Sequence, residues 1–499
     1  MTLSIYNTLS RRQEEFTTVE PGKVKMYCCG MTVYDYCHLG HARTCIVWDV
    51  VRRYLEFIGY DVRYIQNFTD IDDKILKRAR EENSSMEEVA ERYIQAYFED
   101  MSRLGIKEAD EYPRATHSMN GIQRLIHDLE HKGFAYPADG DVYYSVQNFA
   151  EYGKLSGRKL EDMQAGASER VNIEDAEYQK KKYPFDFALW KAAKPGEPAW
   201  ESPWGKGRPG WHIECSAMVR DAFGGRSHRL GDTIDIHVGG ADLIFPHHEN
   251  EIAQSEAVTG QPLANYWLHN GMVKVDGEKM SKSLGNFITI RQLLDSGVDP
   301  MAVRLFVMMA QYRKPIDFTD DAILAATNGW HTIKEGLLFG YQHGKKLGTG
   351  DWGLGTGNNL ISNTYIERFK EAVNDDFNFP GGLVIIFELA KELNRERNII
   401  VHQGKTETPA NELLQKWQTL ITLADVLGLT AKIEIETPKQ DGISNAEIEE
   451  LIQRRWEARK AKNFAESDRI RDELLAKKVV LTDTKDGTFW HPEIIPITK

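Results

Sequence analysis

The segment from residue 23 to residue 68 constrains the fold of this chain more than any other feature. Residues 23–29, KVKMYCC, have the β-branched and aromatic content of a short strand. Residues 42–58 then repeat apolar side chains at helical spacing until Gly59, and residues 61–68, DVRYIQNF, alternate as a second strand. A strand, a helix and a strand in this order predict a βαβ unit, the start of a Rossmann-like, doubly wound parallel sheet of the α/β class.

The remaining sequence indicates where this sheet continues and which domains come after it. Residues 85–135 have a helical pattern, whereas residues 160–210 are irregular and rich in Lys, Pro, Gly and Trp, as expected of an insertion with a poor core. Strand and helix patterns return at 235–240, 247–258 and 268–275. We expect the first half of the α/β domain at 1–120, the insertion at 121–210, the second half at 211–290, a mostly helical region at 291–342, a glycine-rich loop at 343–360, a helical bundle at 361–431, a linker at 432–447 and a small mixed domain at 448–499.

Composition and charge narrow the functional classes. The chain has 499 residues, 41% of them hydrophobic, but no apolar run long enough to span a membrane. Its net charge of −13 argues against a protein that coats nucleic acid non-specifically, although a local basic face remains compatible. Only five cysteines occur, four of them between residues 28 and 45, which suits a reducing cytoplasm rather than a disulfide framework. We expect no signal peptide, and we expect a monomer because nothing in the sequence indicates an obligate dimer.

The turn HLGH, at residues 38–41, follows the first predicted strand and opens the helix. Phosphates bind at such a position in a doubly wound sheet, because free backbone N–H groups and the helix dipole favour anions. Gly40 would allow close approach, and His38 and His41 would donate hydrogen bonds to a crowded phosphate. An isolated motif of this kind is more often two surface histidines, but its place at the end of a strand favours the phosphate site.

A second basic motif, GEKMSKSLGN, spans residues 277–286. Lys279 and Lys282, with Ser281, Ser283 and nearby glycines, have the composition of a mobile cationic loop. Two such lysines can clamp a polyphosphate and follow the charge onto a leaving pyrophosphate. The alternative is a solvated basic loop.

Cysteine, histidine and glutamate side chains from three segments form a candidate metal set. Cys29 ends the first predicted strand, Cys215 lies in GWHIECSAM, and His247 and Glu251 lie in FPHHENE at i and i+4 of a predicted helix. Two thiolates, an imidazole and a carboxylate are a plausible Zn²⁺ set, although buried cysteines and a satisfied helix-start histidine would look the same in the sequence.

Taken together, these motifs resemble the class I aminoacyl-tRNA synthetases, and among them the cysteinyl-tRNA synthetase family. The resemblance rests on YCCGMTVYDYCHLGHAR, NFTDIDDKI, GWHIECSAM, FPHHENEIAQS and KMSKSLGNF, and it extends over essentially the whole chain. It implies ATP-dependent attachment of L-cysteine to tRNA(Cys) through a cysteinyl-adenylate, with Mg²⁺ accompanying ATP and one Zn²⁺ per chain that takes the substrate thiolate as an extra ligand. A pocket that relied on packing alone would separate cysteine from serine by only about 1–3 kcal/mol.

The resemblance also implies roles for individual residues. The expected zinc ligands are Cys29, Cys215, His247 and Glu251; Cys28 would face the other side of its strand, although a swap between the adjacent cysteines stays open. Cys37 and Cys45 are expected to be structural. His38, His41 and Lys282 would be catalytic, and ATP would be bound by His38, Gly40, His41, Gly271, Met272, Lys279, Met280, Ser281, Lys282 and Ser283. Trp211, His237 and Thr69 would line the amino-acid pocket, while Asp70, Asp72 and Asp73 would either meet the substrate ammonium or cap the next helix.

The C-terminal part is predicted to contact tRNA. Residues 451–478 hold nine basic and five acidic side chains, a local net charge of +4 in an acidic chain, and are expected to form one helix before VVLTDTKDGTFWHP. We expect Arg469 to contact RNA and Trp490 to stack on an anticodon base, although Trp490 packed in a small core is the equal alternative. By resemblance, residues 291–342 and 361–431 support the tRNA stem and residues 448–499 read the anticodon.

Two other functions compete with this interpretation. A ligase with the same catalytic domain could join cysteine to an amino-sugar, but such an acceptor needs no long basic C-terminal part. A non-catalytic tRNA-binding relative would be expected to have lost some of the motifs that are intact here.

Overall fold

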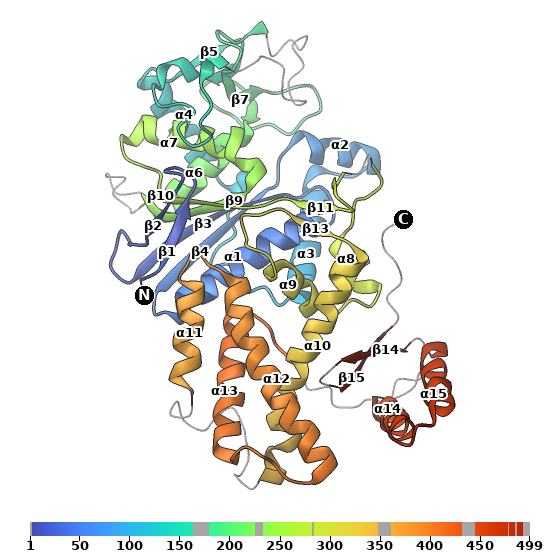
Figure 1. Ribbon diagram of the computed structural model, residues 1–499. Coiled ribbons are helices and arrows are strands. Elements are labelled where there is room, and N and C mark those ends of the chain that lie inside the picture. Colours follow the sequence, from blue (N-terminus) through green and yellow to red (C-terminus); the bar gives the residue numbers. More distant parts are fainter. Residues whose placement is uncertain are drawn as a thin grey trace.

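A four-stranded parallel sheet organises the first two-thirds of the chain (Figure 1). The computed structural model describes residues 2–162, 179–224, 233–281, 284–347, 361–431, 445–477, 479–484 and 487–492. The sheet order is β10 (Ala264–Asn270), β9 (Ile234–Gly240), β3 (Lys23–Thr32) and β4 (Asp61–Thr69), and every neighbouring pair is parallel. This confirms the predicted α/β class, because β3 and β4 are joined across the sheet by helix α1 (Leu39–Phe57).

Helices cover both faces of this sheet. Residues of α1 share one hydrophobic core with Met26 and Cys28 of β3, whereas α6 (Trp211–Phe223) and α7 (Glu249–Thr259) share another with Tyr27 and Cys29. Successive side chains of a strand point to opposite faces, so the adjacent cysteines lie in different cores, as the sequence predicted. The hairpin of β1 (Ser4–Asn7) and β2 (Arg12–Glu15) packs beside β10, where the Asn7 side chain donates to the Asn265 carbonyl over 2.9 Å.

The predicted insertion is an antiparallel sheet with its own core. Its order is β5 (Ala135–Ala138), β6 (Asp141–Tyr144), β7 (Phe187–Ala192) and β8 (Gly207–Pro209), and helix α4 (Met119–His131) packs on it (Figure 1). Short 3-10 turns lie at Val146–Asn148 and Leu160–Asp162. The expectation of a poor core over 160–210 is wrong where that range is described, because Trp190 of β7 is fully buried between these elements.

The helical pattern expected over 85–135 is interrupted. After α2 (Asp73–Glu82), helix α3 (Met86–Arg103) ends at Leu104, and the chain stays irregular, apart from a 3-10 turn at Ala115–His117, until α4 begins at Met119. Gly105 takes a positive φ of 68°, which ends the helix, and Pro113 cannot continue one.

A second small sheet and a group of short helices follow the parallel sheet. This second sheet contains β11 (Val273–Val275), β12 (Glu278–Lys279) and β13 (Ile316–Phe318). The helices α8 (Ile290–Asp295) and α9 (Pro300–Met308) lie between the last two strands in the sequence. Strand β13 was not expected in the mostly helical region; it pairs in parallel with β11 over Val273 to Val275.

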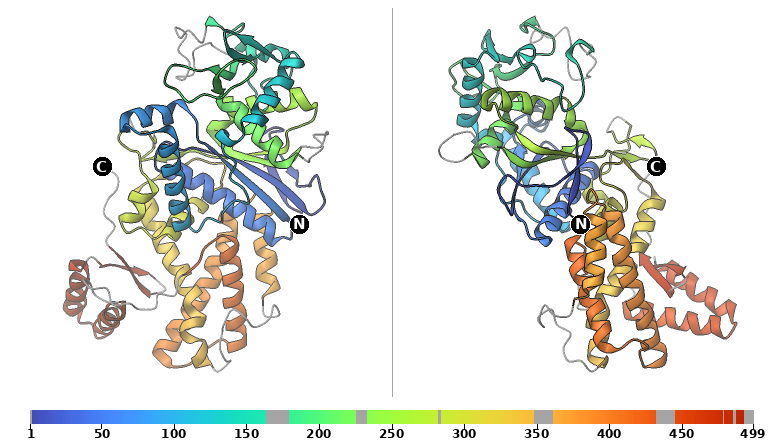
Figure 2. Two further views of the ribbon diagram at one scale, coloured as in Figure 1. Left: turned by 180° about the vertical axis from the view of Figure 1, so that it is seen from behind. Right: turned by 60° about the vertical axis from the view of Figure 1, so that its left-hand side comes forward.

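The helical bundle projects from one side of the sheet domain, as both views in Figure 2 show. It consists of α10 (Asp320–His343), α11 (Asn363–Val373), α12 (Phe379–Gln403) and α13 (Ala410–Val426). A 3-10 turn at Gly344–Leu347 starts the predicted glycine-rich loop, and residues 348–360 lie outside the described part of the chain. Among the described residues, no helix combines the length and apolarity needed to span a bilayer.

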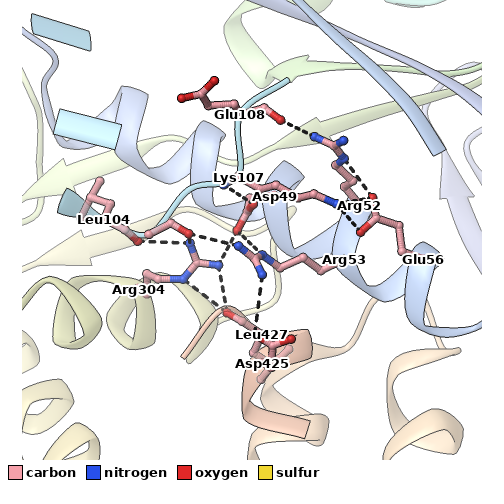
Figure 3. A network of polar contacts seen from close by, with 11 residues as sticks. Asp49, Arg52, Arg53, Glu56, Leu104, Lys107, Glu108, Arg304, Asp425 and Leu427 are labelled. Atoms are coloured by element: carbon pink, nitrogen blue, oxygen red, sulfur yellow. Dashed lines mark hydrogen bonds and ion pairs between the residues drawn. The ribbon is translucent and has the colours of Figure 1, made fainter. Parts of the chain in front are cut away.

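A buried network joins this bundle to the sheet domain (Figure 3). Arg304 of α9 is fully buried and donates to Asp49 Oδ2 of α1 over 2.6 Å and to the Leu427 carbonyl, just after α13, over 2.9 Å. Its other amino group faces the Leu104 carbonyl at 3.3 Å, and Arg53 also donates to Asp49. One guanidinium therefore ties three segments that are far apart in the sequence.

The C-terminal domain differs from its prediction in one respect. Residues 451–478 do not form one helix: α14 (Asn445–Lys460) and α15 (Phe464–Ala476) form a helical hairpin, because Lys462 takes a positive φ of 59° between them. The strands β14 (Val479–Thr484) and β15 (Gly487–Pro492) pair antiparallel beside the helices. The ring of Trp456 stacks on that of His402 at the end of α12, so the domain rests against the bundle.

Candidate active site and metal centre

The four side chains predicted to bind zinc come together in the structure. Cys29 of β3, Cys215 of α6, His247 of the π-helical turn Ile244–His248 and Glu251 of α7 are buried, and their ligand atoms all lie within 4.8 Å of one another. The helix expected from residue 247 begins at Glu249, directly after this turn. The Cys29 thiol is 3.1 Å from Glu251 Oε1, and His247 Nε2 is 3.0 Å from the same oxygen. Two thiols, an imidazole and a carboxylate suit Zn²⁺, so the residues present fit this ion.

The electrostatics of the cluster favour the charged, metal-binding forms of Cys215 and Glu251 but not of Cys29. Contact with Cys29 lowers the pKa of Cys215 to about 6, with His247 adding to the effect, whereas burial and Cys215 raise the pKa of Cys29. Burial alone would raise the pKa of Glu251, but His237 and His247 hold it well below its usual range. One thiolate and one carboxylate are therefore favoured by the protein itself, and these are the forms that bind a metal.

A second group overlaps the first and contains other histidines. Cys29 and Glu251 also lie within 4.8 Å of His237 and His248. His237 Nε2 is 2.9 Å from Glu251 Oε2, and His248 Nδ1 is 2.8 Å from His269 Nε2. The remaining His248 nitrogen has no hydrogen-bond partner among the described residues. We assign to His237 the role of orienting the Glu251 carboxylate, because a hydrogen bond to a ligating group fixes the direction of that group.

The predicted amino-acid pocket residues all touch this cluster or its neighbours. The Trp211 ring, at the start of α6, stacks on His247 with ring centres 4.3 Å apart. Thr69 ends β4 and donates from its hydroxyl to Glu214, the residue before Cys215, over 3.1 Å. His237 contacts Glu251 directly, so the structure gathers the three residues around the cluster.

The acidic run after Thr69 is engaged elsewhere. Asp70 accepts hydrogen bonds from the backbone and hydroxyl of Thr116, and Asp73 pairs with Arg208. Asp72 accepts from the Lys74 backbone N–H over 2.8 Å and is the N-cap of α2. The helix-capping alternative is therefore confirmed for Asp72.

The HLGH turn forms the N-terminus of α1. His38 is the N-cap, and its Nδ1 accepts from the Gly40 N–H over 3.0 Å. The rings of His38 and His41 stack with centres 3.7 Å apart. Burial and the neighbouring His38 lower the pKa of His41, so its imidazole is neutral near pH 7. Both rings therefore lie at the positive end of a helix dipole, where an anion binds favourably.

The described part of the KMSKS loop lies beside this turn. A Cβ built on Gly40 would be 3.6 Å from Met280 Cε, and the Leu39 N–H donates to the Ile288 carbonyl over 3.1 Å. Asn286, the last residue of the GEKMSKSLGN motif but given no role in the sequence analysis, closes the loop by accepting from the Ser281 N–H and donating to the Lys279 carbonyl. Lys282 and Ser283 lie outside the described residues.

Arg43, two residues after His41, was also missed. Its side chain is fully buried and donates to the carbonyls of Met272, Tyr312 and Lys314, the first over 2.8 Å. The sequence signal for such a role is an arginine at helical spacing from the apolar residues of the predicted helix, because that spacing places it on the buried face. Through Arg43, the HLGH helix is tied to the Gly271–Met272 segment predicted to bind ATP.

The two predicted tRNA contacts lie in the C-terminal domain. Trp490 of β15 is half-buried against the small core of Ile448, Leu451 and Ile470, and its Nε1 donates to Glu449 over 3.1 Å. Arg469 of α15 is exposed and pairs with Glu466 and Glu473. Trp490 is thus partly packed against the small core, and contact of either residue with RNA stays a prediction.

A parallel Rossmann-like sheet, an HLGH turn after its strand β3 and a KMSKS motif whose described residues lie against that turn define a class I aminoacyl-tRNA synthetase. Solved structures with this fold include the methionyl-tRNA synthetase of Mycobacterium tuberculosis, with a TM-score of 0.54 and 17% identity over 82% of this chain and 90% of that one. A putative arginyl-tRNA synthetase from Campylobacter jejuni has a TM-score of 0.52 and 14% identity over 84% of this chain and 95% of that one. At these identities the likeness concerns the fold.

Sequence comparisons define the family more narrowly. Residues 15–328 match the class I (C) tRNA synthetase catalytic domain, residues 368–432 the DALR domain, and residues 444–490 the cysteinyl-tRNA ligase anticodon binding domain. The chain is 67% identical to the cysteine–tRNA ligase of Gloeothece citriformis and 66% identical to that of Rippkaea orientalis, over 98% of this chain and all of each relative. The chain belongs to the cysteine–tRNA ligase family.

Proposed function

We propose that the chain activates L-cysteine with ATP as a cysteinyl-adenylate and transfers the cysteinyl group to tRNA(Cys), with release of pyrophosphate and AMP. The observation that carries the proposal is the buried group of Cys29, Cys215, His247 and Glu251 inside a synthetase domain of this family. We further propose, on the grounds of its sequence, that it acts as a monomer in the cytoplasm.

The cluster supports a choice of amino acid by a metal. Cys29, Cys215, His247 and Glu251 would hold Zn²⁺, which when bound supplies a soft centre that takes a thiolate readily and a hydroxyl poorly. Trp211 covers the cluster from the side of His247, and His237 holds the Glu251 carboxylate in place. Thr69 lies next to the same group through Glu214 and is a candidate to contact the substrate backbone.

The HLGH turn and the KMSKS loop support ATP binding. The N-terminus of α1, His38, Gly40 and His41 would face the phosphates, and Gly271 and Met272 would contact adenine. The KMSKS loop would contribute Lys279, Met280, Ser281, Lys282 and Ser283 to ATP binding. These groups stabilise the charge that develops when the cysteine carboxylate attacks the α-phosphorus in line, and Mg²⁺ would accompany the phosphates.

Transfer to tRNA needs no nucleophile from the protein, because the adenylate is already an activated mixed anhydride. The terminal hydroxyl of tRNA attacks the carbonyl carbon, the ester forms and AMP leaves. The C-terminal domain, with Trp490 and Arg469 as the candidates, would contact the anticodon. Its family match over residues 444–490 favours tRNA over an amino-sugar as acceptor.

ATP–pyrophosphate exchange on zinc-loaded protein, with cysteine, serine and alanine in separate reactions, tests the proposal. We expect exchange with cysteine and none above background with the other two. Equal exchange with serine would refute selection by the metal. Absence of exchange with all three would refute adenylation and leave a tRNA-binding protein without catalysis.

A further inference from the structure

Asp376 lies in the helical bundle, yet its carboxylate holds together segments of the sheet domain. It sits in the turn between α11 and α12, where both Asp376 and Phe377 take positive φ values of 53° and 50°. Its side chain is 4% exposed. A buried carboxylate in a strained turn needs compensating donors, and here they come from outside the bundle.

The donors to Asp376 come from two segments of the sheet domain. Oδ1 accepts from the Tyr6 N–H over 2.8 Å and from the Tyr312 hydroxyl over 3.0 Å. Oδ2 accepts from Arg313 Nε over 2.7 Å and from the Gln311 side chain over 3.3 Å. Three of these donors, Gln311, Tyr312 and Arg313, belong to one turn at residues 311–314, called the 311–314 turn from here on.

The 311–314 turn presents its other side to the adenine segment. The Tyr312 carbonyl accepts from the Gly271 N–H over 2.8 Å, and the Met272 carbonyl accepts from the Ile316 N–H just beyond the turn over 3.1 Å. The contact is close enough that a Cβ on Gly271 would lie 2.5 Å from the Lys314 carbonyl. A shift of the turn therefore moves Gly271 and Met272 with it.

The same turn also fixes the HLGH helix. Arg43 donates to the carbonyls of Tyr312 and Lys314 as well as to Met272, and its guanidinium is buried. His41 lies two residues before Arg43 at the start of the same helix. The 311–314 turn is thus the common support of the two segments assigned to adenine and to the phosphates.

We propose that Asp376 is a positioning residue for ATP: from the bundle, it fixes the 311–314 turn and thereby the spacing between the HLGH turn and the Gly271–Met272 segment. This rests on the proposed function, in which those two segments bind ATP. Asp376 touches no reacting atom and acts only through the turn. The geometry of the ATP-binding part of the site therefore depends on how the helical bundle packs against the sheet domain.

The test is Asp376→Asn, assayed by ATP–pyrophosphate exchange with ATP and cysteine varied in turn. The amide keeps the size of the side chain but removes the charge that holds Arg313. We expect the KM for ATP to rise about tenfold while the KM for cysteine stays within about twofold. General destabilisation would instead lower the active fraction, and so kcat, without separating the two KM values.

The matched control is Tyr54→Phe. The Tyr54 hydroxyl of α1 donates to Asn374 Oδ1 over 2.6 Å, so it crosses the same domain junction two residues from Asp376. None of its hydrogen bonds reaches the 311–314 turn. We expect this control to leave both KM values unchanged.

Three outcomes decide the matter. Exchange by the unaltered protein supports the proposed function independently of Asp376. With that established, an unchanged KM for ATP in Asp376→Asn, or an equal rise in both KM values, overturns the positioning role. If Asp376→Asn does not fold, Tyr312→Phe removes one donor alone and must raise the KM for ATP selectively, by a smaller factor, for the proposal to stand.

Discussion

Replacing Gly40 with alanine should damage ATP use while leaving the protein folded. The new Cβ would lie 2.8 Å from Cε1 and 3.0 Å from Nδ1 of His38, so the imidazole must move from its position above the helix end. The move costs the hydrogen bond from the Gly40 N–H to His38 and forces a poorer side-chain rotamer, together about 1–3 kcal/mol. If the same loss applies to the transition state, kcat/KM for ATP falls about 5- to 150-fold.

The melting temperature should fall only modestly, because alanine favours a helix over glycine by up to about 1 kcal/mol and so offsets part of the same cost. Pyrophosphate exchange with ATP varied, together with thermal unfolding, measures both quantities. Gly329→Ala in α10 is the matched control: its Cβ would approach Leu305 and Phe387 to 3.1 Å, remote from the HLGH turn, and activity should persist. Wild-type exchange by Gly40→Ala, or a loss of activity explained by unfolding, would refute the role given to His38.

Two further predictions concern the metal and the C-terminal domain. Cys215→Ser should lower the zinc content measured by atomic absorption and abolish exchange with cysteine, whereas Cys28→Ser, on the other face of the sheet, should keep the metal; equal zinc in both would contradict the ligand set. Asp483 is held by Arg455 at 2.8 Å, and this hydrogen bond keeps its pKa below the usual range. A lowered folded-state pKa stabilises the domain above the ordinary aspartate pKa and loses that contribution as the pH falls below it, so urea unfolding of this domain should become easier below about pH 4. Asp483→Asn should weaken that pH dependence, and an unchanged profile would count against the pair.

The parts of the fold that follow local periodicity could be predicted from the sequence. The alternation along residues 23–29 placed Cys28 and Cys29 on opposite faces, and the structure puts them in separate cores. The break at Lys462 could not be predicted in this way, because a left-handed residue at a helix break leaves the charge and apolar pattern on either side unchanged.

In the candidate site, too, some features could be predicted from the local sequence and others depend on tertiary contacts. Residue chemistry could indicate Cys29, Cys215, His247 and Glu251, but only the tertiary fold brings their ligand atoms together from a strand and two helices. Arg43 and Asp376 escaped notice because their partners are largely backbone carbonyls and N–H groups, which nearly every residue carries, or side chains of a distant turn. A sequence shows that such a side chain is charged but not which distant turn it supports.

The buried Arg304 has a consequence for how the molecule comes apart. Its guanidinium is fully buried and depends on Asp49 in the sheet domain and on the Leu427 carbonyl after the bundle. Pulling the bundle away would leave Arg304 paired with Asp49 but would take the Leu427 carbonyl from its guanidinium, a loss of about 1.5–3 kcal/mol for a hydrogen bond to a charged group. Sheet domain and bundle are therefore bound into one cooperative unit of unfolding, whereas the C-terminal hairpin, with its own small core, can open locally and exchange its amide protons sooner.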